Sequence, residues 1–242
     1  MRIVHYGLTN KGGRPVNEDC IGSAKKGGAE CFILCDGLGG HGMGDKASQL
    51  VTRFAEDGFR SCTELEDFVS SVLILAHTKL TAEQQKMGLN HKMLTTAVIL
   101  VIDGDKGIAI HIGDSRLYRF RNGSAIWRTR DHSVPQMLVM TGEIEDKDIR
   151  FHPDRSRLLR ALGDDSEAAR FDTERFDVRE GDAFLLCSDG FWEPVTEEQM
   201  CASLAESGSP RRWVSGMKKL VKQYNRGKDG DNYSAIAVMI KG

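Results

Sequence analysis

The sequence lacks the compositional features that mark several specialised classes of protein. It has only five prolines among 242 residues, 7% aromatic side chains and a formal net charge of −2 at pH 7. So small a net charge provides no overall field that attracts nucleic acid or anionic lipid, and we expect neither a nucleic-acid partner nor a membrane partner. With 40% apolar and 28% charged side chains, the composition is that of an ordinary globular protein.

Long apolar runs and a secretory leader are also absent. The longest apolar runs, such as residues 97–102, are far too short to cross a bilayer. Residues 1–6 lack the apolar segment and the small-residue cleavage site of a secretory signal. We therefore expect a cytoplasmic protein.

The cysteines form no CxxC pair and show no Cys/His spacing typical of a zinc site. Four of them fall in apolar runs or helical stretches, where a thiol acts as a small hydrophobic group. We expect neither structural zinc nor a disulfide framework from the six, which are Cys20, Cys31, Cys35, Cys62, Cys187 and Cys201.

The order of the predicted elements indicates one α+β domain. No tract of Pro, Ser or Gly is long enough to form an interdomain linker, so residues 1–242 are expected to form a single domain. Apolar runs bounded by Gly or Asp predict strands at residues 31–35, 95–102, 107–112, 116–120, 183–187 and 234–240. Residues 103–106 and 121–124 contain Asp-Gly and Asn-Gly, which tolerate the positive φ of hairpin turns, so neighbouring strands should pair antiparallel.

Three apolar stripes at helical spacing, within residues 47–54, 65–80 and 213–224, predict helices that each bury one face. Their start signals agree with this interpretation. Thr63 with Glu66, and Thr196 with Gln199, fit the capping box, and Ser209 is followed by a proline suited to the first helical position. Helices with one apolar face pack naturally on sheet faces, which predicts a layered α+β fold.

Aspartate recurs beside glycine where apolar strands end, at Asp36, Asp114 and Asp189, and Asp231 directly precedes the last strand. Taken singly, each Asp-Gly is typical of a turn. Taken together, carboxylates at the ends of neighbouring buried strands would repel one another and lose solvation unless a cation compensated them. Oxygen ligands without Cys or His favour Mg²⁺ or Mn²⁺ over zinc.

Near the N-terminus, Arg14 precedes the acidic pair Glu18 and Asp19. The planar fork of arginine matches phosphate oxygens, so this segment together with the aspartates is typical of metal and phosphate chemistry. The alternative is an exposed turn with a solvated ion pair.

Two further patterns suggest other chemistries. Gly37, Gly39 and Gly42 satisfy GxGxxG, but a dinucleotide site also needs a second strand after the first helix, and a second helix is predicted there instead. Ser115 follows Asp114, yet nothing around it resembles the GxSxG turn that exposes a nucleophilic serine. We expect Ser115 to be a buried hydroxyl.

Eight short blocks follow one another along the chain: Arg14 with Asn17, Glu18 and Asp19; then residues 36–41, 95–97, 113–116, 131–133, 152–153 leading to 160–163, 188–190 and 231–234. In their order and spacing they resemble the metal-dependent protein phosphatases of type 2C, the PPM family, in its short bacterial form. The resemblance implies a four-layer αββα fold, in which a sandwich of two antiparallel sheets is flanked by helix pairs. It also implies a protein serine/threonine phosphatase that acts on phosphoproteins and opposes a Ser/Thr kinase. We expect the protein to be a monomer.

The resemblance further implies a binuclear Mn²⁺ or Mg²⁺ centre whose activated water attacks the phosphate. By positional match Asp36 bridges both ions, Asp189 and Asp231 complete the first site, and the Gly37 carbonyl with Glu18 and Asp19 serves the second, directly or through water. A weaker third site would take Asp114, Asp189 and Ser156. Arg14 would hold the substrate phosphate.

The sequence departs from the family pattern at three places. Leu38 occupies a position where some members carry a histidine proposed to protonate the leaving group, so His41 and a metal-bound water stay open as candidates. Leu94 replaces a frequent glycine. The flap segment, residues 141–156, matches the family pattern only loosely. If its acidic run at residues 143–148 borders the cleft, the negative charge would disfavour acidic phosphopeptides. The alternative is that this run forms a solvated loop. The other functions left open are a phosphoprotein-binding relative without activity and a nucleotide-binding oxidoreductase.

Overall fold

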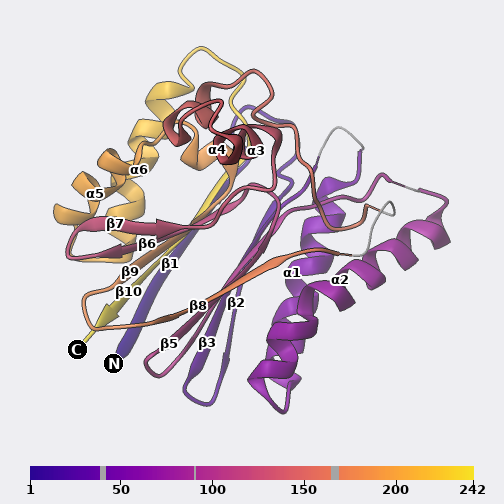
Figure 1. The fold of residues 1–242 in the computed structure, drawn as a ribbon, viewed down its shortest axis with the longest axis horizontal. Coiled ribbons are helices and arrows are strands. Elements are labelled where there is room, and N and C mark those ends of the chain that lie inside the picture. Colours follow the sequence, from indigo (N-terminus) through magenta and orange to yellow (C-terminus); the bar gives the residue numbers. More distant parts are fainter. Residues whose placement is uncertain (39–41, 90, 165–168) are drawn as a thin grey trace.

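The computed structural model describes residues 1–38, 42–89, 91–164 and 169–242 as two packed sheets with helices outside each (Figure 1). The first sheet has the order β1-β10-β9-β6-β7 and the second the order β2-β3-β4-β5-β8, with every pair antiparallel. The strands of the first sheet are β1 (Arg2–Asn10), β10 (Tyr233–Lys241), β9 (Ala183–Cys187), β6 (Arg116–Arg121) and β7 (Ser124–Arg128). Those of the second are β2 (Asp19–Lys26), β3 (Ala29–Asp36), β4 (Ala97–Asp103), β5 (Lys106–Ile112) and β8 (Asp172–Asp177).

The long helices form the two outer layers. The pair α1 (Gly44–Ser61) and α2 (Leu65–Met87) covers the second sheet, and α5 (Glu197–Ala205) with α6 (Pro210–Tyr224) covers the first (Figure 1). Shorter helices, α3 (Val134–Thr141), η2 (Asp146–Phe151) and α4 (Asp189–Trp192), lie at one end of the sandwich. The predicted four-layer α+β architecture is therefore confirmed.

The apolar core has three layers because the central strands are buried on both faces. Along β3, Cys31 and Ile33 pack toward α1 and α2, whereas Phe32 and Leu34 pack between the sheets. This alternation is the two-residue period of a strand, and it explains why such strands read as continuous apolar runs in the sequence.

Most of the predicted local signals are confirmed. Asn122 and Gly123 adopt φ of 52° and 77° in the β6–β7 hairpin. Thr196 accepts a hydrogen bond from the backbone N–H of Gln199 in a complete capping box, and Ser209 caps α6. The predicted capping box at Thr63 is wrong, because α2 begins after Glu64, whose side chain makes no cap hydrogen bond.

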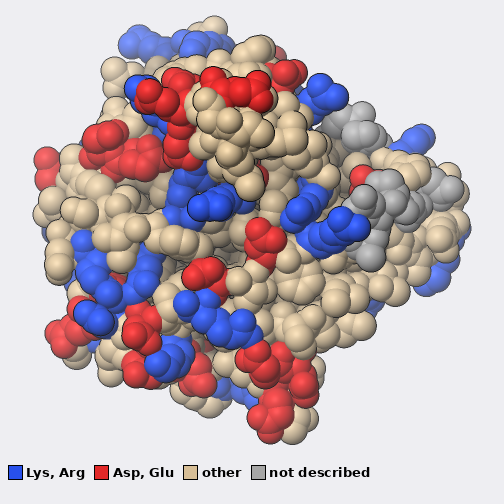
Figure 2. All heavy atoms as spheres, in the orientation of Figure 1, with Lys and Arg blue, Asp and Glu red and all other residues tan. Residues whose placement is uncertain are grey.

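Figure 2 shows basic and acidic side chains interspersed over one face, as expected from a net charge near zero. Among the residues that the structure describes, no helix combines the length and apolar character needed to cross a membrane.

Candidate metal centre

The strand ends bring the predicted carboxylates to one end of the sandwich. Asp36 is the last residue of β3 and lies opposite Asp19, the first residue of β2, in the antiparallel register. Asp114 follows β5, Asp189 opens α4 directly after β9, and Asp231 precedes β10. Strand pairing therefore brings these carboxylates, which are far apart in the sequence, to the same end of the sandwich.

Burial and mutual repulsion dominate the electrostatics of this cluster. Burial raises the pKa of Asp36 well above its usual value, and the carboxyls of Asp19, Asp189, Asp114 and Asp231 raise it further. Burial, followed by Asp114, does the same to the pKa of Asp189. The pKa of Asp19 rises to about 6 and that of Asp114 to about 7, in both cases chiefly through burial. So many buried carboxylates would be costly as anions without a compensating cation.

The donor set fits a hard divalent cation. It offers oxygen atoms alone, the ligands that Mg²⁺ and Mn²⁺ prefer. Asp19 Oδ2 accepts a hydrogen bond of 2.8 Å from the Ser188 hydroxyl, while its Oδ1 is buried and has no hydrogen-bond partner among the residues that the structure describes. A carboxylate oxygen left unpaired in the interior is the kind of atom that a bound ion would satisfy.

A cleft of about 1130 Å³ opens over this cluster. Predicted site residues from six separate segments line it: Arg14, Glu18, Asp36, Gly37, Asp114, Ser156, Asp189 and Asp231. Asp19, 6% exposed, does not line the cleft and lies behind it, next to Ser188. Burial, and then the Asp45 carboxylate, raises the pKa of Glu18 at the cleft wall.

The glycine at position 37 is required by a close approach of two backbones. A Cβ there would lie 2.1 Å from the carbonyl oxygen of Gly44, at the start of α1, and 2.8 Å from that of Glu18. The Gly37 N–H also donates to the Glu18 carbonyl at 3.0 Å. The absence of a side chain therefore lets α1 begin directly beside Asp36.

Arg14 and the acidic pair are held in place by Asn232, which the sequence analysis did not single out. Its side-chain oxygen accepts from the backbone N–H of Glu18 at 2.8 Å, and its amide nitrogen donates to the carbonyls of Lys11 and Val16. Arg14 donates to Asp231 Oδ2 at 2.9 Å. The sequence signals at this position were that Asn232 follows Asp231 and that it falls within the family block at residues 231–234.

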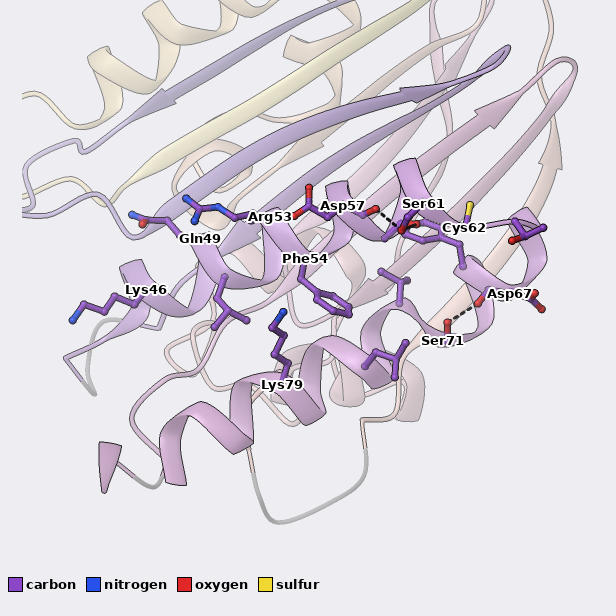
Figure 3. Close-up of a pocket in the computed structure, with 16 residues that line it drawn as sticks. Lys46, Gln49, Arg53, Phe54, Asp57, Ser61, Cys62, Asp67, Ser71 and Lys79 are labelled. Carbon is purple, nitrogen blue, oxygen red and sulfur yellow. Dashed lines mark hydrogen bonds between the residues drawn. The ribbon is translucent and has the colours of Figure 1, made fainter. Parts of the chain in front are cut away.

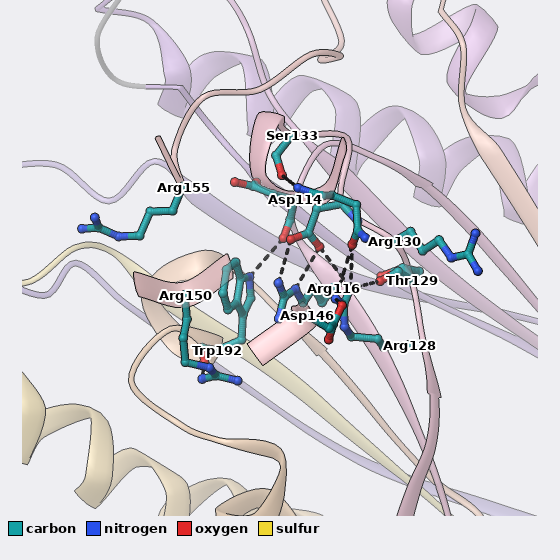
Figure 4. Close-up of polar contacts among 12 residues, drawn as sticks. Asp114, Arg116, Arg128, Thr129, Arg130, Ser133, Asp146, Arg150, Arg155 and Trp192 are labelled. Carbon is teal, nitrogen blue, oxygen red and sulfur yellow. Dashed lines mark hydrogen bonds and ion pairs between the residues drawn. The ribbon is translucent and has the colours of Figure 1, made fainter. Parts of the chain in front are cut away.

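A buried polar cluster supports Asp114 from behind (Figure 4). The Trp192 indole N–H donates to the backbone carbonyl of Asp114 at 3.0 Å, and the Arg116 guanidinium stacks on the Trp192 ring with 3.4 Å between its carbon and the ring centroid. Arg116 also donates to both oxygens of Asp131, at 2.9 and 2.7 Å. Ser115 is buried and shares a hydrogen bond of 2.7 Å with Thr96, so the prediction of a buried hydroxyl is confirmed.

The acidic run of the flap does not border the cleft. Asp146 contacts Arg128, Glu145 pairs with Lys147 at 2.6 Å, and Asp148 caps η2 through the backbone N–H of Glu145. The solvated-loop alternative is therefore the correct one for these side chains, because they are engaged in local pairs and caps.

Besides Arg14, the cations that line the cleft are Lys46, Arg157 and Arg160, and Leu38 also lines it. His41, together with Gly39 and Gly40, lies outside the described residues. The chain runs from α1 directly into α2, with no strand between them in the described part, so the dinucleotide interpretation of the glycine pattern is wrong.

The profile of the family described as protein phosphatase 2C matches residues 10–224. The chain belongs to the protein phosphatase 2C family. It is 34% identical over 232 residues to the serine/threonine protein phosphatase PstP of Mycobacterium tuberculosis, which covers 92% of this chain. This chain spans 42% of the length of that phosphatase.

Solved type 2C structures agree with this assignment. The crystal structure of serine/threonine phosphatase Stp1 from Staphylococcus aureus superposes with a TM-score of 0.90 at 26% identity, over 100% of this chain and 96% of Stp1. The catalytic domain of PstP in complex with two manganese ions superposes with a TM-score of 0.80 at 26% identity, over 99% of both chains.

Proposed function

We propose that this chain is a metal-dependent serine/threonine phosphatase that removes phosphate from phosphoserine and phosphothreonine in proteins. The observation that carries the proposal is the convergence of Asp36, Asp114, Asp189 and Asp231 on one cleft that Arg14 also lines. A divalent cation compensates such carboxylates, and an arginine beside it suits a phosphate dianion. Membership of the phosphatase 2C family supports the same chemistry.

We assign the metal ligands by the positional match of this sequence to the family pattern. Asp36 would contact both of two Mn²⁺ or Mg²⁺ ions, Asp189 and Asp231 would complete one site, and the Gly37 carbonyl with Glu18 and Asp19 would serve the other, directly or through water. Asp114, Asp189 and Ser156 would form a weaker third site. When bound, the ions lower the pKa of coordinated water and offset the charge of the phosphoryl oxygens.

The protein's own contribution is to bind and orient the phosphate. Arg14 is half-exposed at the cleft, and its guanidinium, now paired with Asp231, offers further N–H groups to a phosphate oxygen. Asn232 holds the backbone on both sides of Arg14 through the carbonyls of Lys11 and Val16, and this positions the Arg14 guanidinium group at the cleft. Leu38 provides no proton for the leaving alkoxide, which leaves that role to His41 or to water.

We further propose that residues 1–242 act as a single catalytic domain and as a monomer, in the cytoplasm, on phosphoproteins modified by a Ser/Thr kinase. Three contiguous apolar clusters join both sheets and all the long helices, which supports one folding unit. The near-zero net charge supports phosphoprotein rather than nucleic-acid partners.

The test is hydrolysis of para-nitrophenyl phosphate and of a phosphothreonine peptide by the purified chain. Activity should require Mn²⁺ or Mg²⁺, disappear in excess EDTA and return when the metal is restored. Turnover that is unchanged in excess chelator would refute the metal mechanism, and binding of the phosphopeptide without hydrolysis would indicate an inactive relative.

A further inference from the structure

A second hollow lies outside the metal centre, between α1 and α2 on the outer face of the molecule (Figure 3). It has a volume of about 800 Å³. Leu50 and Phe54 from α1, and Phe68, Val72 and Leu75 from α2, give it an apolar floor. Leu75 is 50% exposed. We refer to this hollow as the α1–α2 groove.

The charges around the α1–α2 groove are divided along its length. Lys46, Arg53 and Lys79 stand at the end near the start of α1, and Asp57 and Asp67 stand toward the other end (Figure 3).

The cations of the groove are open to a partner, whereas an acid at the far end is already engaged. Lys46, Arg53 and Lys79 are exposed, and in the described part of the chain none of them forms an ion pair with an acid. The Lys79 ammonium instead lies 4.9 Å from the centroid of the Phe54 ring. Asp57, in contrast, pairs with Arg60 at 3.2 Å. At the end near Lys46 the unmatched charge is therefore positive and is next to the apolar floor, whereas Asp67 at the other end also has no ion pair among the described residues.

The basic end of the groove adjoins the catalytic cleft. Lys46 lines both the groove and the cleft. It stands in the first turn of α1, and α1 starts where Gly44 packs against Gly37, the residue after Asp36. A polypeptide with its phosphorylated residue at the metal centre can therefore pass Lys46 and continue along α1 without leaving the surface.

We propose that the α1–α2 groove docks a segment of the phosphoprotein substrate that lies outside the phosphorylated site. The segment carries an apolar side chain, which fits between Phe54 and Leu75, and acidic residues on the side facing the phosphorylated residue, which meet Lys46, Arg53 and Lys79. The inference rests on the proposed phosphatase function and adds a substrate class to it. From Lys46 to Asp57 the groove runs about 16 Å along α1, the span of about five extended residues.

Two observations indicate that the α1–α2 groove binds a segment of the substrate: its positive charge, and its connection to the catalytic cleft at Lys46. An unpaired cation row favours an acidic partner and disfavours a basic one. Once the phosphate of a substrate is bound in the cleft, docking of the same chain in the adjacent groove is an intramolecular step. A weak contact in the groove is therefore sufficient to lower KM. A contact of this kind acts on binding and leaves the chemical step unchanged.

The test compares a short phosphothreonine peptide with the same peptide extended by about ten residues, enough to reach along the groove. One extension carries a leucine and several acidic residues, and a second carries lysines in place of the acids; each is made on the N-terminal and on the C-terminal side. We expect the acidic extension on one side to lower KM, and the lysine extension not to. For that peptide, the Leu75→Glu and Lys79→Glu variants should each raise KM by about three- to tenfold, the usual range for losing one contact of moderate strength.

Matched controls separate docking from general damage to α2. Ile74 is as exposed as Leu75, at 48%, but does not line the groove, and Lys86 lies on the same helix beyond it. Ile74→Glu and Lys86→Glu should leave every KM unchanged, and all four variants should hydrolyse para-nitrophenyl phosphate and the short peptide at the wild-type rate.

Several results would overturn the inference. They are equal KM values for the short and extended peptides, an Ile74→Glu effect as large as that of Leu75→Glu, and a dimer in sedimentation that Leu75→Glu dissociates, since a second copy of the chain would then be the occupant. Failure of the wild-type chain to hydrolyse even para-nitrophenyl phosphate would instead refute the proposed function, which keeps the two failures distinct.

Discussion

The His132 ring provides a direct test of how the fold depends on pH. Its Nδ1 accepts a hydrogen bond of 3.1 Å from the backbone N–H of Gly113, the residue before Asp114, and the ring stacks on His111 with 4.8 Å between centroids. Because Nδ1 is the acceptor, the neutral ring carries its proton on Nε2, 3.4 Å from Asp172 Oδ2. A proton added to Nδ1 would break the bond that holds Gly113.

Burial, and then the neighbouring His111, lowers the pKa of His132 from its usual 6.5 to about 4. At His132 the folded state therefore binds fewer protons than the unfolded state between these two values, and the contribution of His132 to the free energy of unfolding must decrease as the pH falls through that window. The depressed pKa corresponds to about 3 kcal/mol in all, of which about 2.5 kcal/mol is lost by pH 4.5.

The measurement is urea unfolding of metal-free wild type, His132→Gln and His152→Gln at pH 7 and pH 4.5. Glutamine can still accept the Gly113 hydrogen bond but does not titrate, so His132→Gln should lose about 2 to 3 kcal/mol less than wild type on acidification. His152 lies in the flap, away from Gly113, and its variant should follow wild type. Parallel pH dependence in wild type and His132→Gln would refute the reasoning.

Three further substitutions probe the site. Asp36→Asn should lower kcat by at least about a thousandfold, because it removes the charge most central to the carboxylate cluster; near wild-type rates at saturating Mn²⁺ would reject its assignment. Arg14→Ala should raise KM for para-nitrophenyl phosphate more than it lowers kcat, with partial rescue by lysine, which lacks the planar fork; unaltered kinetics would make Arg14 a surface residue. Arg116→Met should cost about 3 kcal/mol in urea unfolding because it leaves the buried Asp131 with Arg128, at 3.5 Å, as its one ionic partner among the described residues, and Asp131→Asn in the same background should recover part of the loss; a loss below about 1 kcal/mol would contradict the buried ion pair.

The sequence was sufficient to predict the central strands and the position of the carboxylates. The runs that form β3, β4, β9 and β10 are apolar on both faces and are therefore recognisable as buried strands. The burial of such a strand fixes the position of an aspartate at its end. The strands that were not predicted are different in kind. In β8 every residue is exposed or half-buried, and only its pairing with β5 makes it a strand.

The parts of the site that could not be predicted depend on contacts between distant segments. Asn232 bonds to Lys11, Val16 and Glu18, more than 200 residues away, and nothing in its local sequence indicates those partners. The flap sequence also does not indicate that Asp146 pairs with Arg128, which comes from the β6–β7 hairpin. Helix starts, similarly, are decided by where packing begins, which is why α2 starts beyond Thr63.

The pairing of β1 with β10 has a consequence for the synthesis of the protein. It joins Arg2 to Lys241, and β10 is synthesised after every other strand of the two sheets. Asp19 and Asp36 therefore leave the ribosome long before Asp189 and Asp231, and β1 has no neighbour in its sheet until β10 has been made. A nascent chain of this topology cannot complete its carboxylate cluster before β10 has emerged.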